Sequence, residues 1–141
     1  MEAPIAFICD YAEASGTGKI NALGIGFRTI YAKQVPVRHS HFSLVVQLET
    51  SAVEAGQKEI QVSLIDNDGN QVIPPRKGSI NIPVPKGSHK AIGHFVMEFV
   101  NVEFKQFGTY AIQVGVGGVE VAYVTFNVAQ LPNNQQQQQQ A

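Results

Sequence analysis

Residues 107–128, FGTYAIQVGVGGVEVAYVTFNV, contain two β-rich runs that are joined by Gly117 and Gly118. A two-residue Gly-Gly connection between such runs predicts a β-hairpin, because glycine enters positive φ at both central positions without strain. Counting outward from this loop predicts which residues of the two strands lie opposite each other. The predicted pairs are Val116 with Val119, Val114 with Val121, and Ile112 with Tyr123.

Length and composition are those of an ordinary globular domain. The chain has 141 residues, of which 44% are hydrophobic and 15% charged, and its net charge is −1 at pH 7. This length is sufficient for one domain with its own core. Basic and acidic residues are spread along the sequence without a basic cluster, so we expect neither nucleic acid nor a membrane surface as a partner.

Cys9 is the only cysteine, so the chain cannot form an internal disulfide. The first residues lack the basic segment and the cleavable apolar segment of a secretory signal. No uninterrupted apolar run reaches membrane-spanning length. We therefore expect a cytoplasmic protein.

Alternating apolar and polar residues predict strands along the rest of the chain. The expected strands cover residues 5–11, 19–31, 42–49, 60–64 and 93–104, with shorter pieces at 71–73 and 79–82. The alternation changes phase after Phe99, which predicts a β-bulge near Asn101. No helical period is visible, and about seven to nine strands predict an all-β, antiparallel β-sandwich, with a closed barrel as the alternative.

The sandwich is expected to form a single domain over residues 1–130. Residues 131–141 include two Asn and six Gln. Such a short polar tract buries too little apolar surface to order itself, so we expect a disordered Asn/Gln-rich tail.

Gly108, Thr109 and Tyr110 open the first run of the hairpin just after a turn. This arrangement resembles the tyrosine corner of immunoglobulin-like sandwiches, where a tyrosine near the start of the penultimate strand bonds back to upstream backbone. The resemblance implies an immunoglobulin-like sandwich with Tyr110 as the corner tyrosine. The Cys…Trp…Cys core of antibody domains is missing, because the chain has one Cys and no Trp.

A second resemblance rests on short motifs that follow one another between Ile5 and about Val128. The motifs are Cys9-Asp-Tyr-Ala-Glu, Gly18-Lys-Ile-Asn, Gly24, Pro36, Asp66-x-Asp68-Gly69 and Gly108-x-Tyr110. Together they resemble a family of small bacterial β-sandwich proteins of unknown function. The family implies the fold and brings no activity, cofactor or catalytic residues.

Two loops invite a functional interpretation. Ser15-Gly-Thr-Gly-Lys19 looks like part of a phosphate loop, but Glu13 and Ile20 stand where that motif needs Gly and Ser or Thr. A hairpin turn explains it better. The turn DNDGN carries Asp66, Asp68 and Asn70, whose oxygens are weak candidates for a cation site completed from another loop. A plain turn is the expected interpretation of these residues.

The remaining reactive residues give no catalytic pattern. His39 and His41 could share one face, and His89 or His94 could join them around a metal ion, but solvated loop histidines are the expected interpretation. Nothing nominates a base for Cys9, so we expect a buried core residue. The sequence predicts no catalytic residue, no cofactor and no enzyme.

The predicted pairing gives the hairpin two apolar faces. One carries Tyr110, Ile112, Val114, Val121 and Tyr123, and the other carries the interface candidates Ala122, Val124, Phe126 and Val128. Because a strand in a sandwich has one inner face, the second set predicts a surface for a protein partner or for a second copy in a homodimer. The alternative is a bulge or a covering loop that buries both sets.

We therefore expect a bacterial, cytoplasmic module for protein interaction or structure, without enzymatic activity. The alternative is a β-sandwich that binds a small ligand, a carbohydrate or a cation through loop residues such as Asp66, Asp68 and Asn70.

Overall fold

The computed structural model describes residues 1–84, 86–87 and 89–132. Residues 133–141, most of the expected tail, lie outside this described part. The described part contains ten β-strands, a short 3₁₀ helix η1 (Ala52–Glu54) and no α-helix, which confirms the all-β prediction. The strands are β1 (Glu2–Cys9), β2 (Tyr11–Ala14), β3 (Ile20–Leu23), β4 (Thr29–Ala32), β5 (Val37–Ser51), β6 (Gly56–Ile65), β7 (Arg76–Ile82), β8 (Lys90–Phe104), β9 (Gly108–Val116) and β10 (Val119–Gln130).

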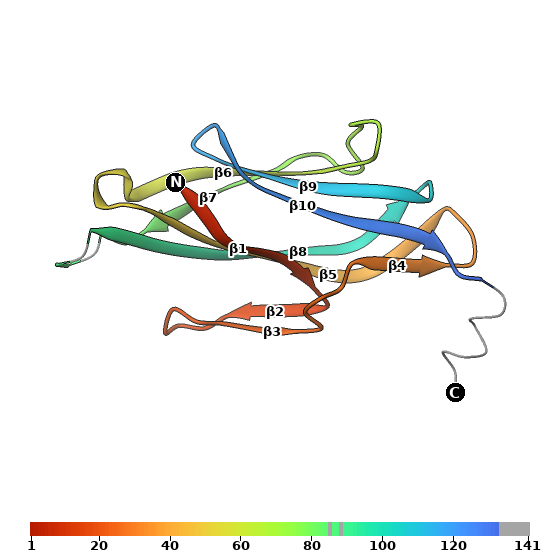
Figure 1. Ribbon diagram of the computed structural model, residues 1–141, viewed down its shortest axis with the longest axis horizontal. Helices are drawn as coiled ribbons and strands as arrows, with labels where there is room; N and C mark the ends of the chain where they lie inside the picture. The colour runs from red at the N-terminus through yellow and green to blue at the C-terminus, as the bar shows by residue number, and fades with distance from the viewer. Residues whose placement is uncertain (85, 88, 133–141) are drawn as a thin grey trace.

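The described strands form three β-sheets that stack as layers (Figure 1). The five-stranded sheet, of order β4-β10-β9-β6-β7, packs on the three-stranded sheet β1-β5-β8, and these two form the sandwich. The hairpin of β2 and β3 is a third layer on the outer face of the three-stranded sheet. Among the strands named, only β4 and β10 pair in parallel. A parallel pair needs a long crossover, and nearly the whole sandwich lies between these two strands in sequence.

Aromatic rings fill the core between the two larger sheets. Phe42, Phe99, Phe104 and Phe126 are all buried. The rings of Phe42 and Phe99 stack with their centroids 4.8 Å apart, and those of Phe104 and Phe126 meet edge to face at 5.8 Å. Burial of each such side chain stabilises the fold by about 1.5–3 kcal/mol, so these rings contribute substantially to the contact between the sheets.

Tyr110 makes the hydrogen bond that the tyrosine corner predicted. Its hydroxyl donates to the backbone oxygen of Gln106 over 2.7 Å. Its ring meets that of Phe104 edge to face, with centroids 4.8 Å apart. The bond and the ring contact together fix the turn that leads from β8 into β9.

The Gly117-Gly118 hairpin is confirmed, but its register differs from the prediction. Val116 pairs with Val119 as expected, and a register shift between Glu120 and Ala122 then pairs Val114 with Ala122 and Ile112 with Val124. The predicted partners Val121 and Tyr123 are therefore wrong. One extra residue in a strand turns every later side chain to the opposite face of the sheet.

This shift also corrects the predicted association surface. Phe126 and Val128 are each 1% exposed and lie in the core. Ala122 and Val124 are half-buried and pack against the same core. The four candidates thus face inward, because the register shift turns them to the same face of the sheet as Tyr110 of β9. The apolar face that we predicted to be exposed is the inner face of the sandwich.

The alternation of buried and exposed side chains in β8 changes phase as predicted, but no bulge causes it. The pairing of β5 with β8 keeps one register along both strands, and Asn101 takes a left-handed conformation with φ of 53°. Phe99 and Val102 are both buried, while Val100 between them is 59% exposed. Asn is among the few residues other than Gly that enter this region at low cost.

The long strand expected at 19–31 is two strands that belong to different sheets. Gly24 and Gly26, with φ of 74° and 98°, break it after β3 and allow the chain to turn toward β4. The piece expected at 71–73 is a single bridge between Ile65 and Gln71. In the described part, no helix is long and apolar enough to cross a membrane.

Candidate functional site

A second, small core holds the β2–β3 hairpin on the three-stranded sheet. Cys9, Ala12 and Val45 are buried there, and half-buried Phe7, Ile20, Ala22 and Val96 pack around them. Burial raises the pKa of the Cys9 thiol, which keeps it protonated, and its Sγ donates to the backbone oxygen of Tyr11 over 3.4 Å. Cys9 is therefore a core residue, as predicted.

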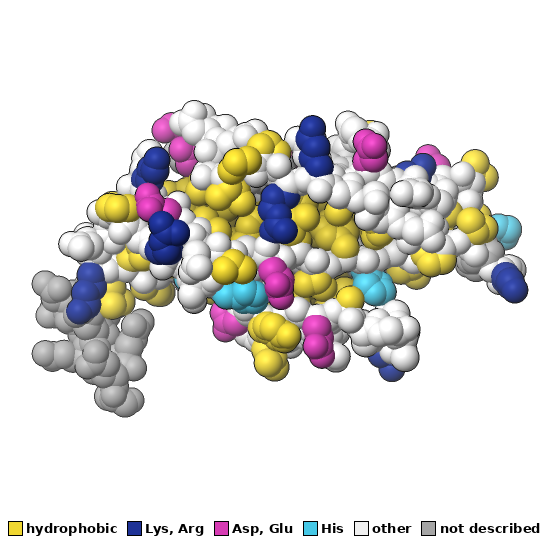
Figure 2. Space-filling view, turned by 180° about the vertical axis from the view of Figure 1, so that it is seen from behind, with side chains coloured by type: hydrophobic (Ala, Val, Ile, Leu, Met, Phe, Trp, Pro, Cys, Tyr) yellow, Lys and Arg dark blue, Asp and Glu magenta, His cyan; other side chains and the backbone are white. Residues whose placement is uncertain are grey.

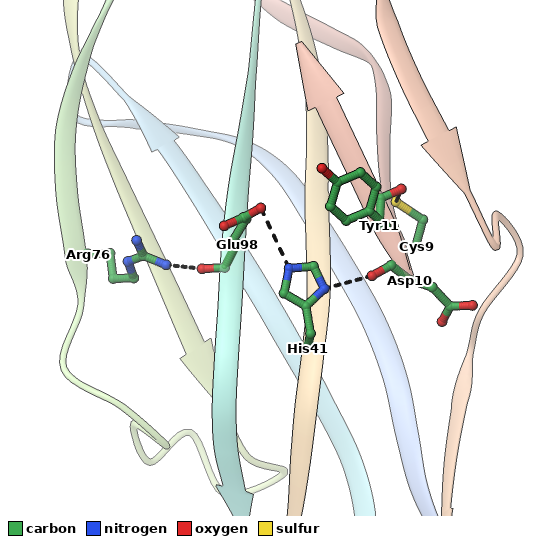
Figure 3. A network of polar contacts seen from close by, with 6 residues as sticks. All are labelled: Cys9, Asp10, Tyr11, His41, Arg76 and Glu98. Carbon is green, nitrogen blue, oxygen red and sulfur yellow. Dashed lines mark hydrogen bonds and ion pairs between the residues drawn. The ribbon is translucent and has the colours of Figure 1, made fainter.

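His41 ties the corner between β1 and β2 to the sheet (Figure 3). Its Nδ1 lies 2.8 Å from the backbone oxygen of Asp10, and its Nε2 lies 3.6 Å from Oε1 of Glu98. Because a carbonyl oxygen only accepts, Nδ1 carries the proton of this bond. The ring of Tyr11 lies 6.0 Å from the imidazole. His41 thus fixes the place where the hairpin begins.

Gly24 closes the same corner from the other side. A Cβ atom at this position would lie 2.2 Å from Oδ2 of Asp10, so only glycine fits. The backbone N–H of Asp10 donates to the oxygen of Leu23 over 3.1 Å. Asp10 and Gly24, which belong to two of the short sequence motifs, thus lie together at this corner and fix the hairpin on the sheet.

A groove runs beside β3, and we call it the hairpin groove. Its volume is about 840 Å³, and its apolar lining comes from the hairpin and from the outer face of β1 and β5. The apolar residues that line it include Ile5, Phe7, Ile20, Leu23, Ile25 and Val45. Glu13, Lys19 and His94 add polar groups. The largely apolar lining suits an apolar ligand.

The turn at Asp66 is held by its own backbone. Oδ1 of Asp66 accepts hydrogen bonds of 2.9 Å from the N–H groups of Asp68 and Asn70. Such a local bond is the usual way in which Asp stabilises a turn. Within the described ranges, no group of three or more His, Cys, Asp or Glu side chains is arranged to hold a metal ion. A cation at this turn remains a prediction.

His39 and His41 do not come together. His39 stacks on Phe27, with ring centroids 5.7 Å apart, and lies beside Phe42 in the main core. Burial lowers the pKa of His39. His41 lies on the outer face with Tyr11 and Glu98. The two side chains separate because the phase of β5 changes between them, opposite Asn101 of β8. The shared face that two-residue spacing suggested is therefore wrong.

A sandwich with a docked hairpin places the chain among small all-β domains. The chain belongs to the family of unknown function DUF6941, which matches residues 4–129. This confirms the predicted membership of a family of unknown function. The matched range includes the hairpin and every residue of the groove. No protein with a curated description matches the chain.

Several solved structures align with part of this chain at low similarity. An alkylpurine DNA glycosylase from Pseudomonas fluorescens is 12% identical with a TM-score of 0.45, over 87% of this chain and 30% of the glycosylase. A β-glucosidase from Listeria innocua is 13% identical with a TM-score of 0.47, over 73% of this chain and 15% of the glucosidase. An uncharacterized protein from Bacillus anthracis is 15% identical with a TM-score of 0.30, over 74% and 86% of the two chains. Similarity this low says nothing about function.

Proposed function

We propose that this protein is a non-enzymatic interaction module that binds an extended apolar segment of a partner protein in the hairpin groove. One observation carries the proposal. Four large apolar side chains, each between 41% and 69% exposed, gather around this single groove. They are Ile5, Tyr11, Leu23 and Ile25. Scattered exposed apolar residues are normal, but a group around one concavity is typical of a binding surface.

The free edge of β3 supports an extended ligand. Within the described chain, β3 pairs only with β2, so its other edge offers backbone N–H and C=O groups. A partner segment could add to this edge as a further strand, as in other cases of strand addition. Alternate side chains of that segment would then enter the groove, where Phe7 and Val45 form part of the floor.

Cys9 and Tyr110 have structural roles in the described part of the chain, which supports a non-enzymatic role. Burial raises the pKa of both the Cys9 thiol and the Tyr110 hydroxyl. Cys9 lies beneath the hairpin, and Tyr110 fixes the corner before β9. Shifted pKa values that stabilise a fold need no catalytic explanation.

Site-specific crosslinking tests this function. A photoreactive amino acid replaces Leu23 in the groove or, as the control, Val53 in η1, which is 95% exposed. We expect illumination of native cells to give a discrete adduct from position 23 and none from position 53. Mapping of the adduct should identify an apolar segment of another protein. Adding Ile25→Lys, at a position that is 63% exposed, should remove the adduct without unfolding the chain.

Three results would overturn the proposal. Equal products from positions 23 and 53 would mean that the groove has no preferred ligand. An adduct that survives Ile25→Lys would mean that the apolar groove does not bind the partner. A crosslink between two copies of this chain would be recognised by its mass and would also contradict a heterologous ligand.

A further inference from the structure

In the described structure, no strand pairs with the outer edge of β8. This strand of 15 residues is the last in its sheet and pairs only with β5. The backbone oxygen of Glu98 accepts a hydrogen bond from Nη1 of Arg76, which belongs to the other sheet. That oxygen therefore points away from β5. Because backbone groups alternate along a strand, those of Ile92, His94, Val96 and Val100 also point outward.

The side chains along this edge are self-complementary. Ile92, Val100 and Glu98 are exposed, and His94 and Val96 are half-buried. These five residues lie on one face of β8, with Val96 at the centre. His94 and Glu98 stand two residues to either side of Val96, and Ile92 and Val100 stand two residues farther out. Antiparallel pairing of this sequence with itself would therefore join unlike polar groups and like apolar groups.

We propose that β8 is the contact edge of a homodimer, in which two copies pair antiparallel with Val96 on the two-fold axis. His94 then lies opposite Glu98 of the second copy, and Ile92 lies opposite Val100. Such an isologous contact uses one surface twice and closes on itself. It joins the two three-stranded sheets into one continuous sheet. About ten backbone hydrogen bonds form, two for each pair with facing backbone groups.

This register satisfies the geometry of the sheet. Outward-pointing residues meet outward-pointing residues, so both partners supply N–H and C=O groups to each pair. The guanidinium of Arg76 lies over the ring of Phe99, 5.7 Å from its centroid, which places Arg76 on the core side of the strand. A carbonyl oxygen has two lone pairs. The backbone oxygen of Glu98 can therefore accept from Nη1 of Arg76 and also from the backbone N–H of His94 in the second copy.

The proposed contact also covers apolar surface beside the edge. β7 and β8 face each other without strand pairing, and Phe95 and Met97 of β8 are only half-buried against the core. Figure 2 shows hydrophobic side chains in a hollow between the layers, with Lys and Arg side chains across it. A long edge that no strand pairs with and that carries exposed apolar residues such as Ile92 and Val100 can pair with another strand unless something covers it. This inference does not depend on the hairpin groove.

Two double variants test the register, because Ile92 and Val100 are 52% and 59% exposed and tolerate polar residues. Ile92→Lys with Val100→Lys places like charges opposite each other across the contact. Ile92→Lys with Val100→Glu places opposite charges there. We expect light scattering after gel filtration to give a dimer for the wild type and for the Lys/Glu variant. The Lys/Lys variant should fall to about half that mass.

Thermal unfolding serves as the control, since both variants should melt cooperatively. A monomeric wild type at high concentration would overturn the proposal, whether the edge is then capped or taken by another protein. A dimer that survives Lys/Lys would exclude β8 as the contact. Equal loss of the dimer in both variants would exclude this register. None of these outcomes bears on crosslinking at position 23, so the two proposals fail separately.

Discussion

Replacement of Tyr110 by Phe isolates the hydrogen bond that fixes the corner before β9. The ring is 3% exposed, and it packs between Phe104 and Phe126 at centroid distances of 4.8 Å and 5.8 Å. Tyr110→Phe keeps this packing and removes only the bond of 2.7 Å to the oxygen of Gln106. A hydrogen bond of this kind contributes about 0.5–1.5 kcal/mol net. Gln106 is exposed, so water can replace the lost donor, and we expect a loss of about 1 kcal/mol.

Urea unfolding followed by circular dichroism measures this loss. With a slope of about 2 kcal/mol per molar urea, the midpoint should fall by about 0.5 M. Tyr123→Phe is the matched control, because Tyr123 lies on the same hairpin and is 57% exposed. Its midpoint should stay within the equivalent of about 0.5 kcal/mol. Equal midpoints for wild type and Tyr110→Phe would refute the role of the corner, as would equal shifts in both variants.

Three further substitutions have defined outcomes in the same urea assay. Gly24→Ala should cost about 2 kcal/mol or more, because left-handed backbone is unfavourable for Ala and the new Cβ would meet Asp10. Ser43→Ala should stabilise by about 1 kcal/mol, because its hydroxyl is buried without a hydrogen-bond partner in the described structure. Phe126→Lys should unfold the protein, since loss of a buried ring alone costs about 3–5 kcal/mol and a buried charge adds to it. Burial raises the pKa of the Tyr110 hydroxyl above its ordinary value of 10.0. The stability of the wild type should therefore fall toward that of Tyr110→Phe as the pH rises above 10.

Each of these predictions has a contradicting result. Gly16→Ala is the control for Gly24, because nothing lies within 4 Å of its added Cβ; equal losses would deny the close contact with Asp10. A destabilised Ser43→Ala would mean that the hydroxyl has a partner. A folded Phe126→Lys would contradict the burial of β10. For the pH prediction, burial keeps Tyr110 protonated in the folded state, so its contribution is complete below pH 10 and decreases as pH rises through the folded pKa. A stability difference that stays constant while the pH rises through the folded pKa of Tyr110 would contradict it.

Strong local signals made much of the fold predictable. Gly117 and Gly118 enforce a tight hairpin whatever surrounds them, and Tyr110 needs only a nearby backbone oxygen for its corner. The third layer had no such signal. The alternation of Leu23 and Ile25 continues past Gly24 and Gly26 as if one strand ran on. The alternation of large and small side chains in a sequence predicts a strand, but it does not show whether a glycine within it takes a positive φ. Gly24 takes a positive φ beside Asp10, which is distant in sequence, and β3 ends at Leu23.

The predicted association surface was misplaced because a single extra residue in β10 reversed the assignment of faces. If β10 continued from Val119 without a register shift, Val121 and Tyr123 would face the core, and Phe126 would face outward. The shift between Glu120 and Ala122 exchanges these faces and buries Phe126 beside Tyr110. The surplus apolar surface that the sequence contains is real, but it lies elsewhere, on Leu23 and Ile25 of the hairpin groove and along β8. Tests of association therefore belong at those two surfaces, because a charge at Phe126 would report only the stability of the core.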